Sequence, residues 1–327
     1  MATITAGAES APIHAASGQP PSPAQHRIET LDFIRGVALC GILLMNITGF
    51  GLADAYTNPA NSGGATGINL WTWIITEVGF EGTQRALFSM LFGASTILLT
   101  SRLEAAGRTD VGDIYARRNL WLVGFGLINS WFLLWDGDIL YMYGVIALFI
   151  FPFRKMAPRR LLIAGLIAMG LMALWNGYDT SVTLAKHGAY AQAIAARSHA
   201  ARLTPAQTEA IKTWEEEREH FKSSPQEIRD DVAAHRGGYF STQRLVARGI
   251  MWSQSRGLYR WFFDVFSMML IGMALFRMGV LTNERPVRLY WVMLVLGYGI
   301  GLTVNILETR WIIDHQFSAV SFAQAAP

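Results

Sequence analysis

Charged and amide side chains interrupt the apolar stretches of this chain at positions where chemistry could occur. Asp32, Arg35 and Asn46 lie in the first stretch and, at 100° per residue, fall on one side of a helix. A guanidinium there could orient a lipid headgroup or the phosphate of a cofactor, and the stripe would line a path into the bundle. A simpler interpretation also fits: Asp32 caps the helix and pairs with Arg35, while Asn46 hydrogen-bonds another helix.

A second group of polar residues, Glu77, Glu81 and Arg85, repeats every four residues and therefore shares one helical face. A carboxylate beside a partly buried guanidinium can act as a general base or take part in a proton relay. The acidic turn 136–138 is predicted on the same side of the membrane, and it contributes Asp138. We therefore take Glu81 and Asp138 as candidate catalytic residues, with an ordinary ladder of salt bridges as the alternative.

Further polar residues lie inside later apolar stretches, and Asn305 with Glu308 repeats the pattern in the last one. An ionisable group in hydrocarbon costs about 2.5 kcal/mol or more, so those that occur usually face a protein interior or a wet cavity. We expect a cavity open to the outside, although a structural hydrogen bond would equally explain Asn129. The predicted substrate-binding residues are Asp32, Arg35, Asn46, Arg85, Asn129 and Asp264.

The elements that carry these residues are predicted to be membrane-spanning helices, because crossing about 30 Å of hydrocarbon takes around 20 apolar residues. The fold class is therefore all-α, a polytopic membrane helix bundle. Segment 68–80 is too short to cross and contains Glu77, so we expect an interfacial or re-entrant helix, or one long kinked helix over 68–102. The seven predicted crossings are 31–53, 85–102, 119–136, 139–154, 161–178, 259–280 and 289–313.

Lysine and arginine residues occur in every second gap between these segments, which predicts the orientation of the chain. Gap 54–67 and turn 136–138 contain none and carry aspartates instead. The N-terminus is then cytoplasmic and the C-terminus outside, in the inner membrane of a bacterium. The residues that decide this are Arg102, Arg108, Arg117, Arg118, Arg154, Lys155, Arg159, Arg160, Arg277, Arg285 and Arg288.

Residues 179–258 differ from the rest, since they are rich in charge and contain four of the seven histidines. We predict a water-facing helical insertion between membrane regions 27–178 and 259–313. Thr204-Pro205 with Gln207, and Ser224-Pro225 with Glu227, each have the pattern of a capping box. Range 239–258 mixes apolar residues with arginines, which is typical of a helix at the outer interface. The polar leader, 1–26, is predicted to be disordered.

Composition excludes several classes of protein. With 52% hydrophobic and 16% charged residues, the chain would make a poor soluble globule. The net charge of +3 is small, and the sequence contains no basic stripe of the kind that binds nucleic acid, so we expect no nucleic-acid partner. No pair of histidines has metal-ligand spacing on one helix, and Cys40 is the single cysteine, so we predict no metal site and no disulfide. Glycines at 36, 41, 124, 126, 272 and 279, and those of Gly297-Tyr298-Gly299-Ile300-Gly301, are interpreted as sites of close helix packing.

Four motifs, in order, resemble the YeiB-like family of bacterial inner-membrane proteins, a domain of unknown function. They are Leu31-Asp32-Phe33-Ile34-Arg35-Gly36 followed by Asn46, the segment from Arg85 to Gly93, Gly137-Asp138-Ile139-Leu140, and the segment from Met269 to Leu275. The resemblance covers residues 27 to about 310. That family is distantly similar to transmembrane acyltransferases, in which a histidine follows a comparable first-helix motif.

Two departures from those patterns bear on function. No histidine occurs between Met45 and Asp179, which leaves Glu81 or Asp138 as the candidate base. Asn129 also stands where many relatives have histidine. The chain stops after a short tail, 314–327, whereas the family pattern continues with more helices. We therefore expect this chain to be truncated relative to the family.

The resemblance implies membrane acyl transfer from a cytoplasmic donor, with acyl-CoA as the candidate, to an acceptor on the outer face. Arg85 would then steady negative charge, and Asn46 and Asn129 would position the acyl carbonyl. Two other classes use the same residues differently. A transporter would move a small metabolite or lipid headgroup without covalent chemistry, and a scaffold would act through its insertion. The expected partners are the lipid bilayer and a small-molecule or lipid substrate; the sequence does not indicate the oligomeric state.

Overall fold

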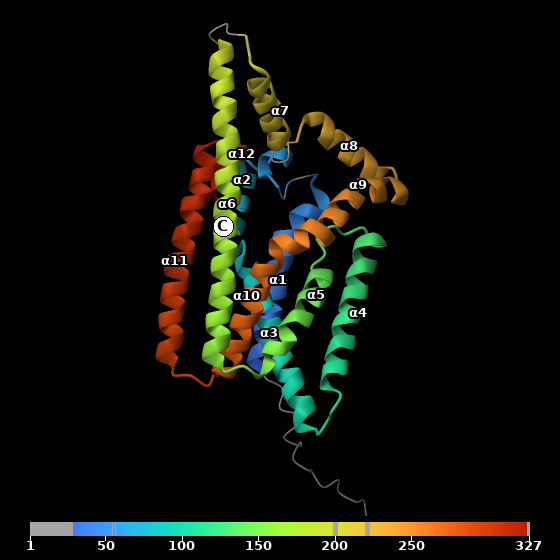
Figure 1. Ribbon diagram of the computed structural model, residues 1–327, viewed down its shortest axis with the longest axis vertical. Helices are drawn as coiled ribbons and strands as arrows, with labels where there is room; N and C mark the ends of the chain where they lie inside the picture. Colours follow the sequence, from blue (N-terminus) through green and yellow to red (C-terminus); the bar gives the residue numbers. More distant parts are fainter. Residues whose placement is uncertain (1–28, 54, 56, 199–201, 220–222, 326–327) are drawn as a thin grey trace, which may run out of the picture.

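The computed structural model describes residues 29–53, 55, 57–198, 202–219 and 223–325, and every regular element in these ranges is helical. The predicted leader 1–26 lies outside them. Figure 1 shows long helices running side by side, with α7, α8 and α9 at one end. The helices are α1 Glu29–Gly51, α2 Gly67–Phe80, α3 Thr83–Ala105, α4 Val111–Trp131, α5 Leu140–Ile150, α6 Pro158–Ser198, α7 Pro205–Glu219, α8 Pro225–Arg236, α9 Tyr239–Trp252, α10 Leu258–Arg277, α11 Val287–Asp314 and α12 Ala319–Ala325.

The prediction of an all-α membrane bundle is confirmed, and five helical stretches in the described residues are long and apolar enough to span a membrane. They are 29–51, 67–105, 158–198, 239–277 and 287–314. The other two predicted crossings became α4 and α5. Helix α4 begins at Val111 and so includes Asp113, Arg117 and Arg118, while the 11 residues of α5 reach only about 16 Å before Pro152 starts a tighter turn.

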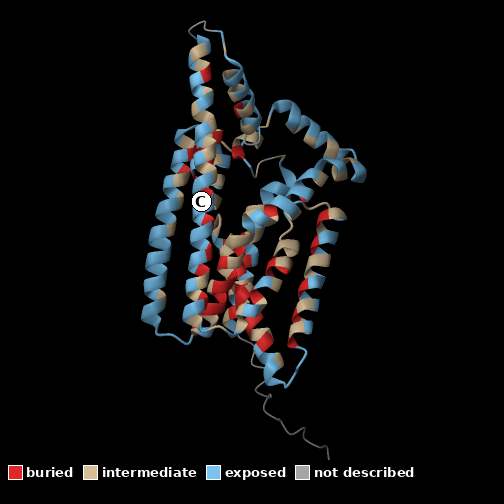
Figure 2. Ribbon diagram, viewed as in Figure 1, coloured by how far each residue is buried: buried red, intermediate tan, exposed pale blue. Residues whose placement is uncertain are grey.

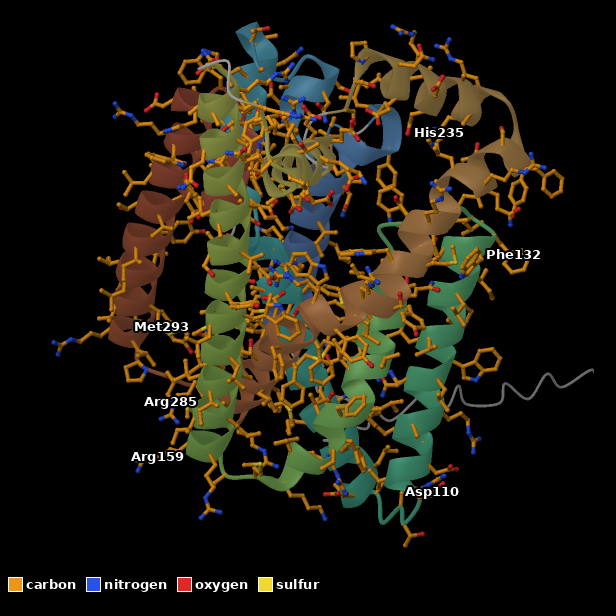
Figure 3. The ribbon with its side chains drawn as sticks, turned by 45° about the horizontal axis from the view of Figure 1, so that its top comes forward. Asp110, Phe132, Arg159, His235, Arg285 and Met293 are labelled. Carbon is orange, nitrogen blue, oxygen red and sulfur yellow. The ribbon has the colours of Figure 1, made fainter. Side chains whose placement is uncertain are left out.

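Two names describe the ends of the bundle. The arginine end carries the connections 106–110, 151–157 and 278–286, and Figure 3 places Asp110, Arg159 and Arg285 there. The insertion end carries α7, α8 and α9 (Figure 1). Helices α3 and α10 both run from the insertion end to the arginine end, so they are parallel neighbours.

The core of the bundle lies where α3, α5, α6 and α10 meet. Its fully buried side chains include Ile146, Met269 and Leu270, and Figure 2 shows the buried residues concentrated around these helices in the lower half of the molecule. At the crossing of α3 and α10, a Cβ built on Gly93 would lie 1.9 Å from the Met269 carbonyl oxygen. A Cβ on Gly272 would lie 2.0 Å from the Met90 carbonyl oxygen, so each helix needs glycine at this contact.

Helix α6 is longer than predicted. The predicted membrane segment ended at 178 and the insertion began at 179, but α6 continues unbroken to Ser198. Its 41 residues reach about 60 Å, because nothing between Gly177 and Ser198 breaks a helix. The projecting part packs on α7, where the rings of His187 and Trp214 lie 4.8 Å apart.

Local signals in the insertion were predicted correctly. The Thr204 and Gln207 pair and the Ser224 and Glu227 pair both make the reciprocal bonds of a capping box. Helices α2 and α3 are separated by a two-residue break, but together they form one of the stretches long enough to span a membrane, so the interfacial and the kinked-helix interpretations of segment 68–80 both stay predictions. The α2–α3 break contains Gly82, whose φ of 67° is a left-handed conformation that favours glycine.

Helix α11 lies at the edge of the bundle (Figure 1), and none of its most apolar stretch is buried. The prediction that Gly297, Gly299 and Gly301 pack closely against a helix is wrong for the described residues, since nothing lies within 4 Å of a Cβ built on any of them. The same holds for Gly36 and Gly124, whereas the glycines at 41, 126 and 272 do make close contacts.

We predict that Gly93→Ala and Gly272→Ala each lower the unfolding free energy by about 1–3 kcal/mol, because the new methyl group would push two backbones apart. Thermal unfolding of the detergent-solubilised protein measures this. Gly299→Ala adds the same methyl group where there is open space, so its midpoint should stay unchanged or rise slightly. Equal losses in all three variants would contradict the packing argument.

Candidate functional site

A cavity of about 470 Å³ lies between α1, α3 and α4 at the arginine end. One part of its wall is apolar and the other part is polar. The apolar part consists of Phe88, Leu91, Phe92, Leu98 and Leu99. The polar part consists of Arg35, Ser95, Thr96, Arg102, Tyr115, Arg118 and Asn119. We call this cavity the arginine pocket.

Arg35 of α1 is held at the mouth of this pocket by two contacts. It donates hydrogen bonds to Asp32, at 3.1 Å, and to the Ser95 hydroxyl of α3, at 2.5 Å. The predicted boundary ion pair therefore exists. Because Arg35 also lines the cavity, the ion-pair and ligand-binding interpretations of this residue are compatible.

The polar wall of the pocket is rigid as well as basic. The Tyr115 hydroxyl donates to the Ala147 carbonyl, at 2.9 Å, and lies 3.1 Å from the hydroxyl of Thr96. Asn119 donates to the Tyr115 carbonyl at 2.9 Å. Three guanidinium groups in the lining make the pocket suited to an anion, and the apolar wall suits a chain attached to that anion.

Two predicted substrate-binding residues, Arg85 and Asp264, meet near the insertion end. They form an ion pair that joins α3 to α10, and the Arg85 guanidinium lies 4.8 Å from the centre of the Trp261 ring. Below this pair the Ser89 and Tyr143 hydroxyls are 2.5 Å apart. These contacts connect α3, α5 and α10, and the carboxylate of Asp264 neutralises the charge of Arg85.

Asn129 and Asp138 also lie together, but in a structural arrangement. The Asn129 amide donates to one carboxylate oxygen of Asp138, at 2.8 Å, and the Tyr141 backbone N–H donates to the other, at 2.9 Å. Asp138 thus caps the start of α5, and Gly126 lets that start approach α4 closely. This geometry favours the structural alternative for Asn129, while a catalytic role for Asp138 stays a prediction.

Glu81 occupies the break between α2 and α3. Its carboxylate accepts a hydrogen bond from the Gly82 backbone N–H and lies within electrostatic range of Arg85 and Glu77. Glu77 in turn is within electrostatic range of Glu308 of α11. The predicted grouping of Glu77, Glu81 and Arg85 therefore persists, although the helix is interrupted between them.

The remaining predicted residues are more scattered. Asn46 donates to the Ile42 carbonyl of its own helix, at 2.9 Å, and within the described part of the chain it shows no bond to a neighbouring helix. Of the eight predicted site residues, Arg35 alone lines the arginine pocket. Glu81 lies in the break just before α3. From the start of that helix at Thr83, the nearest lining residue of the pocket, Phe88, is about 8 Å along the axis and Ser95, in the polar wall, is about 18 Å.

Sequence reasoning missed most of the pocket. Arg102 and Arg118 were used only as markers of orientation, and Ser95, Tyr115 and Asn119 were not considered. Their spacing was a usable signal. Ser95 and Arg102 are seven residues apart, which is about two helical turns, so they lie on one face of α3. Tyr115, Arg118 and Asn119 follow the i, i+3, i+4 pattern of one face of α4.

One titratable cluster lies outside the membrane-spanning helices. Desolvation raises the pKa of Asp136, in the turn between α4 and α5, and the nearby His235 opposes that rise. His235 belongs to α8 (Figure 3) and pairs with Asp231, at 3.1 Å. The cluster connects the insertion to the bundle and adds nothing to the pocket.

Comparison with known proteins supplies the family. The chain is 31% identical, over 304 residues, to the uncharacterized protein YeiB of Escherichia coli (strain K12); the match covers 91% of this chain and 69% of YeiB. The chain belongs to the YeiB family. It is also 34% identical over 153 residues to the uncharacterized protein YxaH of Bacillus subtilis (strain 168), covering 44% of this chain and 36% of YxaH.

A third relative is an uncharacterized 39.9 kDa protein in the amylase 3' region of Bacillus acidopullulyticus, 32% identical over 155 residues, covering 47% of this chain and 42% of that protein. No family model matches the chain, and no solved structure matches it. None of the three relatives has a name that states an activity, so similarity to acyltransferases stays an expectation from the sequence.

We predict that Asp138→Ala lowers the unfolding free energy by about 1–2 kcal/mol, because both the helix cap and the bond to Asn129 are lost. Asp138→Asn keeps an oxygen that can accept from the Tyr141 N–H, so it should cost less than half as much. Chemical denaturation of both variants provides the comparison. If Asp138→Ala unfolds like the wild type, Asp138 is not the cap that the geometry indicates.

Proposed function

We propose that this protein is a membrane acyltransferase whose arginine pocket binds a phosphate-bearing acyl donor, with acyl-CoA as the first candidate. We also propose that it resides in the bacterial inner membrane with the arginine end in the cytoplasm. Positive-inside bias supports that orientation, because the gaps at this end hold the lysine and arginine clusters. A soluble, phosphate-rich donor would then meet the pocket on the side where it is made.

The observation that carries the proposal is the composition of the pocket wall. Arg35, Arg102 and Arg118 come from three different helices and line one cavity. Guanidinium groups bind phosphate through paired, charge-assisted hydrogen bonds. The volume of about 470 Å³ is in the range of small-molecule sites, and the phenylalanine and leucine wall can take an acyl or other apolar chain.

Glu81 is the better of the two candidate bases. Both carboxylate oxygens of Asp138 already accept hydrogen bonds, whereas Glu81 is bonded to the Gly82 N–H beside it. In the proposed step, Glu81 takes the proton from an acceptor O–H or N–H, and the acceptor attacks the thioester carbonyl. The C–S bond breaks, the acyl group moves to the acceptor, and Glu81 returns the proton to the departing thiolate, which leaves as the thiol.

The geometry sets a requirement for this step. Because about 18 Å of α3 separates the polar wall at Ser95 from the helix start next to Glu81, an acyl donor anchored there by its phosphates must carry its thioester on a long arm. A short donor whose phosphates are held at the polar wall could not bring its carbonyl near Glu81. The proposal therefore favours donors with an extended linker between phosphate and acyl group.

Transport is the second candidate function, and the pocket itself is the reason. Among the residues that the structure describes, its lining supplies cations and hydroxyl groups but no carboxylate that could act as a base. A lipid headgroup or phosphorylated metabolite could bind there and cross without covalent change. The two proposals share their binding residues and differ in what happens at Glu81.

We predict that Arg35→Gln, Arg102→Gln and Arg118→Gln each weaken acyl-CoA binding by tenfold or more, on the order expected for one charge-assisted hydrogen bond. Calorimetric titration of the full-length protein in nanodiscs measures this. Arg117→Gln is the matched control, because Arg117 neighbours Arg118 but pairs with Asp113, at 2.8 Å, on an exposed surface. Its affinity should match that of the wild type.

A turnover assay separates the two candidate functions. With radiolabelled acyl-CoA and a panel of hydroxyl and amine acceptors, Glu81→Gln should abolish acylated product while donor binding is retained. Flux of a phosphorylated compound that needs Arg35 but forms no acylated product would support transport and remove acyl transfer. Unchanged binding in all three pocket variants would contradict both.

A further inference from the structure

We propose that the exposed face of α9 binds the headgroups of anionic phospholipids in the leaflet at the insertion end. This surface is separate from the arginine pocket, and the proposal does not depend on acyl transfer. In this proposal α9, in the last part of the insertion, binds the membrane surface and so holds the insertion against it.

The position of α9 follows from the length of α10. Helix α10 has 20 residues, which cover about 30 Å and therefore the hydrocarbon thickness of a bilayer. A five-residue π-helical turn, Ser253–Gly257, joins it to α9. Figure 1 shows α9 leaving the direction of α10 and running across the insertion end above α4 and α5. An α10 that spans the hydrocarbon therefore places α9 at the interface of the insertion end.

Contacts on its inner side fix how α9 is rotated. Ile250 is fully buried. The Tyr239 hydroxyl donates to the Trp131 carbonyl at the end of α4, at 3.2 Å, and the Trp131 ring N–H donates to Gln254, at 3.1 Å. These bonds hold the opposite side of α9 away from the protein.

That outer side carries a stripe at four-residue spacing, Phe240, Arg244, Arg248 and Trp252. Phe240 is 71% exposed and Trp252 is 50% exposed, so both present large apolar surface to their surroundings. The two arginines between them are also exposed. Aromatic residues that flank arginines suit a bilayer interface, where rings enter the acyl boundary and guanidinium groups reach phosphates.

Charge decides which lipid fits. Between Tyr239 and Leu258 the sequence contains three arginines, Arg244, Arg248 and Arg256, and no aspartate or glutamate. Helices α7 and α8, by contrast, carry a high density of acidic residues in the runs 215–219 and 227–231. An anionic leaflet would attract α9 and repel α7 and α8, so the same field orients the whole insertion.

The first experiment measures depth. A nitroxide on Met251→Cys, in a Cys40→Ser background, reports on the outer face without altering the stripe, and one on Gln226→Cys of α8 is the water-exposed control. The full-length protein is placed in nanodiscs of phosphatidylglycerol or of phosphatidylcholine. We expect the Met251 label in phosphatidylglycerol to collide more with oxygen and less with a water-soluble nickel chelate than the control label does.

The second experiment tests charge. The triple variant Arg244→Gln, Arg248→Gln and Arg256→Gln should shift the Met251 label toward the accessibility of the control, since each arginine is worth on the order of fivefold in partitioning to an anionic surface. The matched variant Arg218→Gln, Arg229→Gln and Arg236→Gln removes the same charge from α7 and α8. It should leave the label immersed.

Three results would overturn the proposal. A Met251 label as water-accessible as Gln226 in phosphatidylglycerol would show that the face does not touch lipid. Equal immersion in both lipids, unchanged by the triple variant, would show apolar insertion without recognition of anionic lipid. Protection of the label in lipid-free detergent would mean that a second protein copy covers the face.

Discussion

The close approach of α3 and α10 is the constraint on which the rest of the bundle depends. Two parallel helices come into direct backbone contact, at Gly93 against Met269 and at Gly272 against Met90. Eight residues before each glycine, on its own helix, stands one member of the Arg85 and Asp264 ion pair. Because the offsets are equal, glycine contact and ion pair share one register, and a slip of either helix by one turn would separate the charges.

Fixing α3 in this way gives it two chemically different ends. At one end Ser95 and Arg102 face a cavity between α1 and α4, and at the other Glu81 lies beside a helix break and near Arg85. The left-handed Gly82 allows α2 to leave the direction of α3, so Glu81 is not buried inside a continuous helix. Helix α3 therefore holds Ser95 and Arg102 at a fixed distance from the helix break that contains Glu81.

How far the sequence predicted this structure can be judged from particular residues. Apolar runs and capping patterns are local, so the helix starts at Thr204 and Ser224 and the all-α bundle were predictable. The length of α6 was not, because the polar residues after 178 suggested a boundary where the helix simply leaves the membrane. The arginine pocket was not, because it exists only when α1 and α4 pack on α3. Glycine patterns were ambiguous for the same reason: Gly272 meets a neighbour and Gly299 does not.

Arginines at the ends of membrane helices can serve orientation and ligand binding at once, and α4 separates these two roles. Arg117 and Arg118 are adjacent and add equal charge to the same connection, so they contribute equally to orientation. Arg117 pairs with Asp113 on the surface, whereas Arg118 lines the cavity. The difference is one of direction around the helix, about 100° per residue. A positive charge needed only for orientation could point either way, so orientation alone does not account for the convergence of Arg35, Arg102 and Arg118 from three helices on one cavity.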